Sequence, residues 1–166
     1  MKFTRLLMLL SLQLCAIICN GQLKDFSQLV LISRYSEAEL KTFLKMHKFK
    51  YEGDVVAPGH STKMKSWGYK NHIDGETEGA ISYTPVNNRL IVSYLTTDPE
   101  FLSLSQSQLH HYGYTLDKKV QKPNNDISYI YSNKENQFAI RIWKQHHRRL
   151  MLFIISNKKD IDVLNN

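Results

Sequence analysis

The chain has 166 residues, of which 42% are hydrophobic and 22% are charged, and its formal net charge is +7. This length is sufficient for one domain with its own core. The basic residues are spread along the chain without a long basic run or a nucleic-acid-binding motif, which argues against nucleic acid as the partner.

Residues 1–21 have the features of a secretory signal peptide. Lys2 and Arg5 give a positive start, and an apolar run follows from residue 6 to residue 18. That run is shorter than the roughly 20 residues of a membrane-spanning helix, so an uncleaved anchor is the weaker alternative. Small residues at positions 19–21 then place the mature N-terminus near Gln22.

Both cysteines, Cys15 and Cys19, lie inside this segment. A lipoprotein acylated at either one is a weaker alternative, because each follows a bulky residue. Without cysteines, residues 22–166 can form no disulfide and offer no thiolate ligand. We expect a soluble secreted or periplasmic domain with no transmembrane segment, and a mature charge of +5 that permits an acidic partner.

The first elements of the mature chain are predicted to be a strand and a helix. The apolar run Leu29–Ile32 is typical of a short buried strand. Ser36 and Glu39 have the spacing of a capping box, which predicts a helix start that continues toward Phe49. One helical face carries Leu40, Phe43, Leu44 and His47. We expect this face, including the histidine at its margin, to pack on a sheet.

From Phe49 onward the hydrophobic pattern has a period of two, which predicts half-buried antiparallel strands. Two long turns interrupt these strands, at residues 53–65 and 71–79. Residues 81–95 then form a predicted hairpin around Pro85.

A second helix is predicted after this hairpin. Thr97 and Glu100 have capping-box spacing, Pro99 suits a first helical turn, and Gly113 is a stop signal. Its apolar stripe comprises Phe101, Leu102, Leu109 and Tyr112. Four more strands are predicted near residues 114–120, 127–131, 138–143 and 150–155.

The two halves of the chain match in order and alternation, which indicates an internal duplication. The matched pairs include Phe49 with Tyr114, Trp67 with Tyr129, Ile81 with Ile140, and Leu90 with Leu150. The predicted fold is therefore α+β: two tandem helix-plus-four-stranded antiparallel repeats, approximately 29–95 and 90–156, forming one compact domain. The alternative is that two antiparallel segments share strand-like composition by coincidence.

Aromatic residues are frequent on the predicted strands. Trp67 shares a strand face with Tyr69, and Tyr129 shares one with Tyr131. If either pair pointed outward, the sheet would present an aromatic binding surface. We expect them to point inward, because each sheet must pack one face on its helix.

No catalytic, phosphate-binding or dinucleotide-binding motif is present in the sequence. Ser61 lies beside His60, but no orienting carboxylate is indicated. Alternating His72, Asp74, Glu76 and Glu78 could offer metal ligands on one side of an extended chain. A solvated acidic turn is the simpler interpretation, and we expect no cofactor.

Features that differ between the halves are the leading candidates for function, because shared features are explained by folding. These are the long turns of the first half and the basic stretch at residues 144–149, which is predicted to form a hairpin tip. That tip could bind an anion or guard the sheet against edge pairing. The candidate binding residues are His60, His72, Asp74, Glu76, Lys144, His146, His147 and Arg148.

The sequence thus favours an exported, non-enzymatic binding or inhibitor-like module. It would act through an exposed sheet face or the first-repeat loops, on a protein or another envelope component. Duplicated helix-on-sheet modules are often exported binders, a fold-level analogy only. The alternatives are a small exported hydrolase or metal-dependent enzyme, and a structural component of an envelope assembly.

Overall fold

The computed structural model describes residues 22–56, 63–70, 77–86, 89–145 and 147–157. The helices in these ranges are α2 (Phe26–Ser33), α3 (Glu37–Met46), α4 (Pro99–Leu109) and the 3₁₀ turn η1 (His110–Tyr112). The strands are β1 (Lys50–Val56), β2 (Lys63–Lys70), β3 (Thr77–Val86), β4 (Arg89–Thr96), β5 (Thr115–Gln121), β6 (Ile127–Ser132), β7 (Asn136–Gln145) and β8 (Arg148–Asn157).

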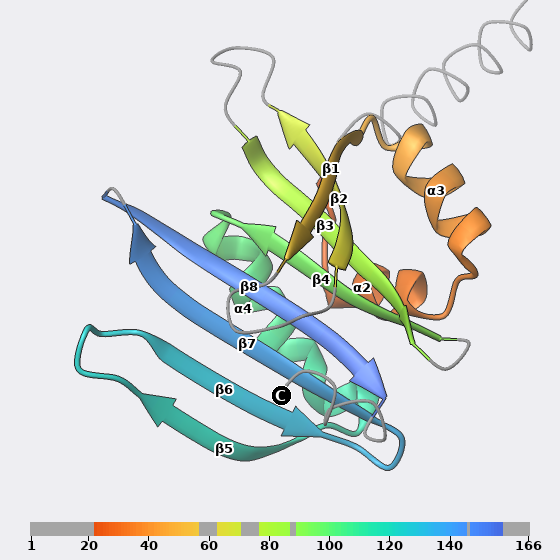
Figure 1. The fold of residues 1–166 in the computed structure, drawn as a ribbon. Helices are drawn as coiled ribbons and strands as arrows, with labels where there is room; N and C mark the ends of the chain where they lie inside the picture. Colours follow the sequence, from red (N-terminus) through yellow and green to blue (C-terminus); the bar gives the residue numbers. More distant parts are fainter. Residues whose placement is uncertain (1–21, 57–62, 71–76, 87–88, 146, 158–166) are drawn as a thin grey trace, which may run out of the picture.

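All eight strands form one antiparallel sheet in the order β1-β2-β3-β4-β8-β7-β6-β5 (Figure 1). The predicted α+β class and antiparallel strands are confirmed. The two groups of four strands are joined through β4 and β8, where Tyr94 is paired with Phe153. One continuous sheet therefore replaces the two sheets that the sequence suggested.

The predicted strand at Leu29–Ile32 is wrong, because these residues belong to helix α2. Asp25 caps this helix by accepting a hydrogen bond from the backbone N–H of Gln28 at 3.2 Å. The helix contacts α4, β4 and β8, and Phe26, Leu29, Val30 and Ile32 are all buried. Leu31 is also apolar although it is 48% exposed, so residues 29–32 form an unbroken apolar run in which no helical period can be seen.

The start of α3 is as predicted, whereas the start of α4 is not. Ser36 and Glu39 form the reciprocal capping box, with a Ser36 N to Glu39 Oε2 distance of 2.8 Å. In α4 the cap is Asp98 rather than Thr97, and its carboxylate accepts from the N–H of Glu100 at 2.9 Å. Gly113 ends the second helical segment in a left-handed conformation, with φ of 70°.

The core lies between the sheet and the three helices. A cross-strand row on this side of the sheet runs Trp67, Ile81, Tyr94, Phe153, Ile140, Tyr129. Phe153 is fully buried and contacts Phe101 and Phe138, with ring centroids 4.8 and 6.2 Å apart. Such aromatic clusters contribute both buried area and specific ring geometry.

The expectation that the two aromatic pairs, Trp67 with Tyr69 and Tyr129 with Tyr131, point inward is confirmed, whereas Trp143 of β7 lies on the opposite face. Trp67 is buried, and Tyr69, Tyr129 and Tyr131 pack against the same core. His47 also has a packing role, because its ring stacks on Phe43 at 4.1 Å.

One proposed match between the halves is wrong. Leu90 points into the core, whereas Leu150 points to the opposite face together with its partner Trp143. Because side chains alternate along a strand, a shift of one residue exchanges the two faces. The position that Leu90 occupies therefore has no counterpart at Leu150.

Candidate binding surface

The second face of the sheet, here called the open face, points away from the helices (Figure 1). Strand pairing defines one row of side chains that crosses all eight strands on this face. From β1 to β5 the row is Gly53, Ser66, Ser82, Ser93, Ile154, Ala139, Ile130 and Lys118. The row is thus small and polar in β1–β4 and aliphatic in β6–β8.

The serines of β2, β3 and β4 are held by hydrogen bonds across the strands. Ser82 donates to the hydroxyl of Ser66 at 3.1 Å, and Ser93 donates to the carbonyl of Ser82 at 3.3 Å. Ser66 and Ser93 are both buried. On the same face of these strands Met64, Thr84 and Ile91 are buried as well, so little of this half of the open face is exposed.

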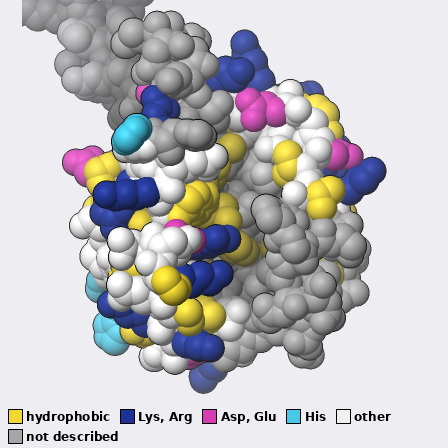
Figure 2. All heavy atoms as spheres, turned by 60° about the vertical axis from the view of Figure 1, so that its left-hand side comes forward, with side chains coloured by type: hydrophobic (Ala, Val, Ile, Leu, Met, Phe, Trp, Pro, Cys, Tyr) yellow, Lys and Arg dark blue, Asp and Glu magenta, His cyan; other side chains and the backbone are white. Residues whose placement is uncertain are grey.

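The aliphatic part of the open face lies around the β4–β8 junction. It consists of the partly exposed residues Leu95, Ile130, Ala139, Leu150, Leu152 and Ile154, together with Trp143. Viewed from the side of the β5–β6 and β7–β8 turns, hydrophobic side chains gather in a hollow with Lys and Arg side chains beside them (Figure 2). Adjoining apolar side chains on a sheet face that no helix of the described residues covers are a common feature of interaction sites.

Arg141 is one of the charged residues that adjoin this aliphatic strip in register. It pairs across β7–β8 with Leu152 and lies 5.4 Å from the Trp143 ring centroid. Its guanidinium also binds the nearly buried carboxylate of Asp126 at 3.2 Å. Arg141 is therefore oriented beside the apolar residues by these two contacts, although its side chain is 47% exposed.

The basic stretch forms the β7–β8 turn, so the predicted location at a hairpin tip is confirmed. Lys144, His147 and Arg148 are exposed there, and His147 has a positive φ of 68°. His146 lies outside the described residues. Whether this tip binds a partner stays a prediction.

The other candidate residues, His60, His72, Asp74 and Glu76, also lie outside the described residues. Within the parts of the chain that the structure describes, no group of three or more His, Asp or Glu could hold a metal ion. The hypothesis that the first-repeat loops bind a partner or metal is accordingly untested.

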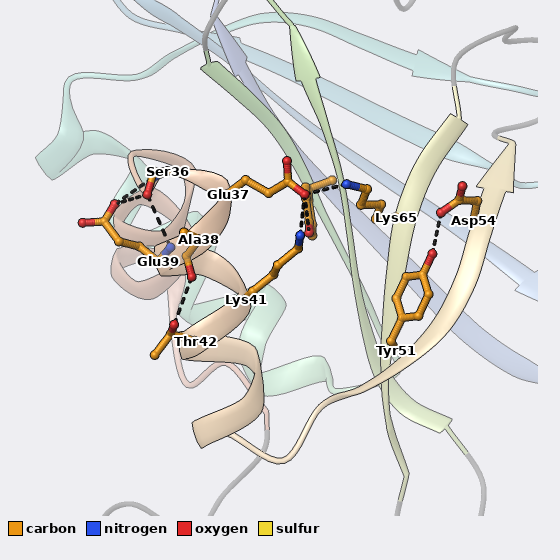
Figure 3. Close-up of polar contacts among 10 residues, drawn as sticks. Ser36, Glu37, Ala38, Glu39, Lys41, Thr42, Tyr51, Asp54 and Lys65 are labelled. Atoms are coloured by element: carbon orange, nitrogen blue, oxygen red, sulfur yellow. Dashed lines mark hydrogen bonds and ion pairs between the residues drawn. The ribbon is translucent and has the colours of Figure 1, made fainter.

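A polar cluster that the sequence did not indicate joins α3 to the sheet (Figure 3). Glu37 accepts hydrogen bonds from Lys41 and from Lys65 of β2, at 2.8 and 2.5 Å. These two lysines lower the pKa of the Glu37 carboxyl from its usual 4.5 to about 2. Beside it, the Tyr51 hydroxyl donates to Asp54 at 2.6 Å, and this bond raises the pKa of Tyr51. The cluster connects elements, and we assign it a structural role.

A polar cavity of about 300 Å³ lies where α2 ends beside β4, β7 and β8. Arg34 and Glu135 line it, but both side chains are exposed and no buried charge points into it. We assign no ligand to this cavity.

No known protein family, curated protein or solved structure matches this chain. None of the helices in the described ranges is long and apolar enough to cross a membrane.

Proposed function

We propose that the protein is an exported, non-enzymatic binding module whose open sheet face contacts a protein partner. The observation that carries this proposal is the contrast between the two faces of one sheet. One face is covered by three helices, whereas the other has a strip of partly exposed aliphatic residues centred on Leu152 and Ile154. The proposal of export depends on the signal-like residues 1–21.

A protein partner fits this surface better than a small molecule does. The strip extends over several strands, whereas a small ligand is usually enclosed in a concave pocket. Protein interfaces combine an apolar centre with a polar rim. Leu95, Leu152 and Ile154 would supply the centre, while the partly exposed Ser82 and the exposed Arg141 would supply the rim. The first-repeat loops are a second candidate for the same contact.

An internal duplication is the simplest origin for this sheet, and we infer one with a corrected register. The core row reads the same from both edges toward the junction: Trp67 and Tyr129, then Ile81 and Ile140, then the central pair of Tyr94 with Phe153. In addition, both edge strands have a register shift, between Tyr51 and Gly53 in β1 and between Leu116 and Lys118 in β5. A duplicated pair of hairpin units related by a two-fold axis at β4–β8 accounts for both features.

Site-specific photo-crosslinking in the cells that naturally produce the protein tests the binding proposal. A photoreactive residue in place of Leu152 should give one discrete adduct, whose partner mass spectrometry identifies. The control position is Met46, an exposed apolar residue of α3 on the other side of the molecule. A second substitution, Ile154→Asp, should abolish the adduct without unfolding the protein, because Ile154 is only partly buried.

The proposal fails if Leu152 and Met46 give the same adducts, or if Ile154→Asp leaves the Leu152 adduct unchanged in a folded protein. If a photoreactive residue between β1 and β2 gave the adduct and residue 152 did not, the first-repeat loops would be the binding site instead of the sheet.

A further inference from the structure

Positive charge is unevenly distributed between the two halves of the sheet. Residues 50–96, which include β1–β4, contain five basic and five acidic residues, whereas residues 115–157, which include β5–β8, contain eight basic and three acidic residues. The β5–β8 segment therefore has a net charge of +5, and the β1–β4 segment has none. The fold does not require this difference in charge, and a net positive charge promotes association with anions.

Most of these cations lie at one end of the sheet. The β5–β6 and β7–β8 turns emerge at the same end, because β5 to β8 are successive antiparallel strands (Figure 1). Residues 118–126 and 141–150 at this end contain seven basic residues and one acidic residue, Asp126, which is paired with Arg141. We call this the cationic end; its basic residues are Lys118, Lys119, Lys122, Arg141, Lys144, Arg148 and Arg149.

The cations lie on both faces of the sheet. Strand alternation places Lys118, Arg141 and Arg148 on the open side, and Lys119, Lys144 and Arg149 on the helix side. A peptide or small anion bound to one face would contact only one of these sets. A broad anionic surface that meets the end of the sheet would contact both.

Apolar side chains accompany these charges. Trp143 and Leu150 are paired neighbours close to the β7–β8 turn, and both are partly exposed. Tryptophan favours the interface between lipid head groups and acyl chains, and basic residues are attracted to anionic lipid head groups. An acidic polysaccharide would leave Leu150 without a complementary group.

We propose that the cationic end docks the protein on an anionic phospholipid surface. This contact is peripheral: the basic residues bind lipid phosphates and Trp143 enters the interfacial layer. It shares Arg141, Trp143 and Leu150 with the open face but does not require Leu152 or Ile154, so either proposal can fail while the other stands.

Sedimentation of the purified protein with vesicles tests this inference. One set contains phosphatidylcholine and phosphatidylglycerol at about 7:3, a composition with the negative surface charge that the proposal requires, and the other contains phosphatidylcholine alone. We expect binding to the first set at low salt and loss of binding at high salt, because salt screens these contacts. Brominated phosphatidylglycerol should also quench Trp143 fluorescence, whereas the buried Trp67 should be unaffected.

Two variants with the same change in total charge locate the contact. Arg148→Glu with Arg149→Glu should weaken vesicle binding by at least about tenfold, because each basic residue near the membrane contributes severalfold. Lys63→Glu with Lys70→Glu changes two exposed lysines of β2 in the neutral half and should alter binding by less than about threefold.

Equal losses from both variants would overturn the inference, as would equal binding to neutral and anionic vesicles. Binding to a soluble polyanion such as heparin with the same affinity, without quenching by the brominated lipid, would also overturn it and would indicate an acidic polysaccharide instead.

Discussion

Replacing Glu37 by Gln tests whether the polar cluster in Figure 3 holds α3 against the sheet. The substitution keeps the size of the side chain but removes the charge that binds Lys41 and Lys65. The folded pKa of about 2 lies below the usual 4.5, which corresponds to at most about 3 kcal/mol of stabilisation. The Glu37 and Lys65 side chains are 32% and 39% exposed, however, so water and salt screen the pair.

Exposed ion pairs contribute at most about 1 kcal/mol, and we expect a loss of about this size for Glu37→Gln at pH 7. This loss of stability should become smaller as the pH is lowered. Because folding lowers the pKa of Glu37, its stabilisation is complete above about pH 4.5 and disappears as the pH falls toward 2. The difference between the native protein and the variant should shrink over the same range.

Urea unfolding measured at several pH values from 7 to 2.5 provides the assay, with equal slopes required for a valid comparison. The matched control is Glu135→Gln, which removes the same charge from an exposed turn where Glu135 forms no ion pair with any of the described residues. A Glu37→Gln variant as stable as the native protein at pH 7, or a difference that grows on acidification, would refute this account of the cluster.

Four further substitutions test the fold, each by the change in the free energy of unfolding in urea. Phe153→Ala should cost about 3–5 kcal/mol because the ring is fully buried, whereas Leu152→Ala on the open face should cost about 1 kcal/mol; equal costs would mean that the faces are misassigned. Gly113→Ala should cost about 1 kcal/mol because φ is 70° there and a side chain would meet no compensating contact. Asp98→Ala should cost about 1 kcal/mol through loss of the α4 cap, and no loss there would leave Thr97 as the functional cap.

Local signals in the sequence are sufficient to predict most of the strands and helix α3. The capping box at Ser36 and Glu39 has a single local interpretation, and the period-two pattern located β5 to β8 to within a few residues. The run Leu29–Ile32 was ambiguous, because a short apolar segment buried on several sides looks alike as a strand or as a helix. The cap at Asp25, four residues earlier, was the available signal for a helix.

The features that could not be predicted from the sequence depend on contacts between segments that are far apart in the chain. Pairing of Tyr94 with Phe153 makes one sheet from two groups of strands, and no local pattern specifies which strands meet at that junction. The same holds for Glu37 and Lys65, which are brought together only when α3 packs on β2. The sequence suggests an exposed sheet face only if its aromatic residues point outward, whereas the described residues of the open face are mainly aliphatic and small.

Accessibility of the open face is the property on which the proposed function depends, and single cysteines can measure it. Residues 22–166 contain no cysteine, so one can be introduced at Leu152, at the neighbouring Met151, or at Met46 as the exposed standard. The rate of maleimide labelling of the folded protein should be high at 46, intermediate at 152 and very low at 151, because Met151 is fully buried in the core. If 152 were labelled as slowly as 151, the sheet would be covered on both faces, and the open face could not be the binding surface.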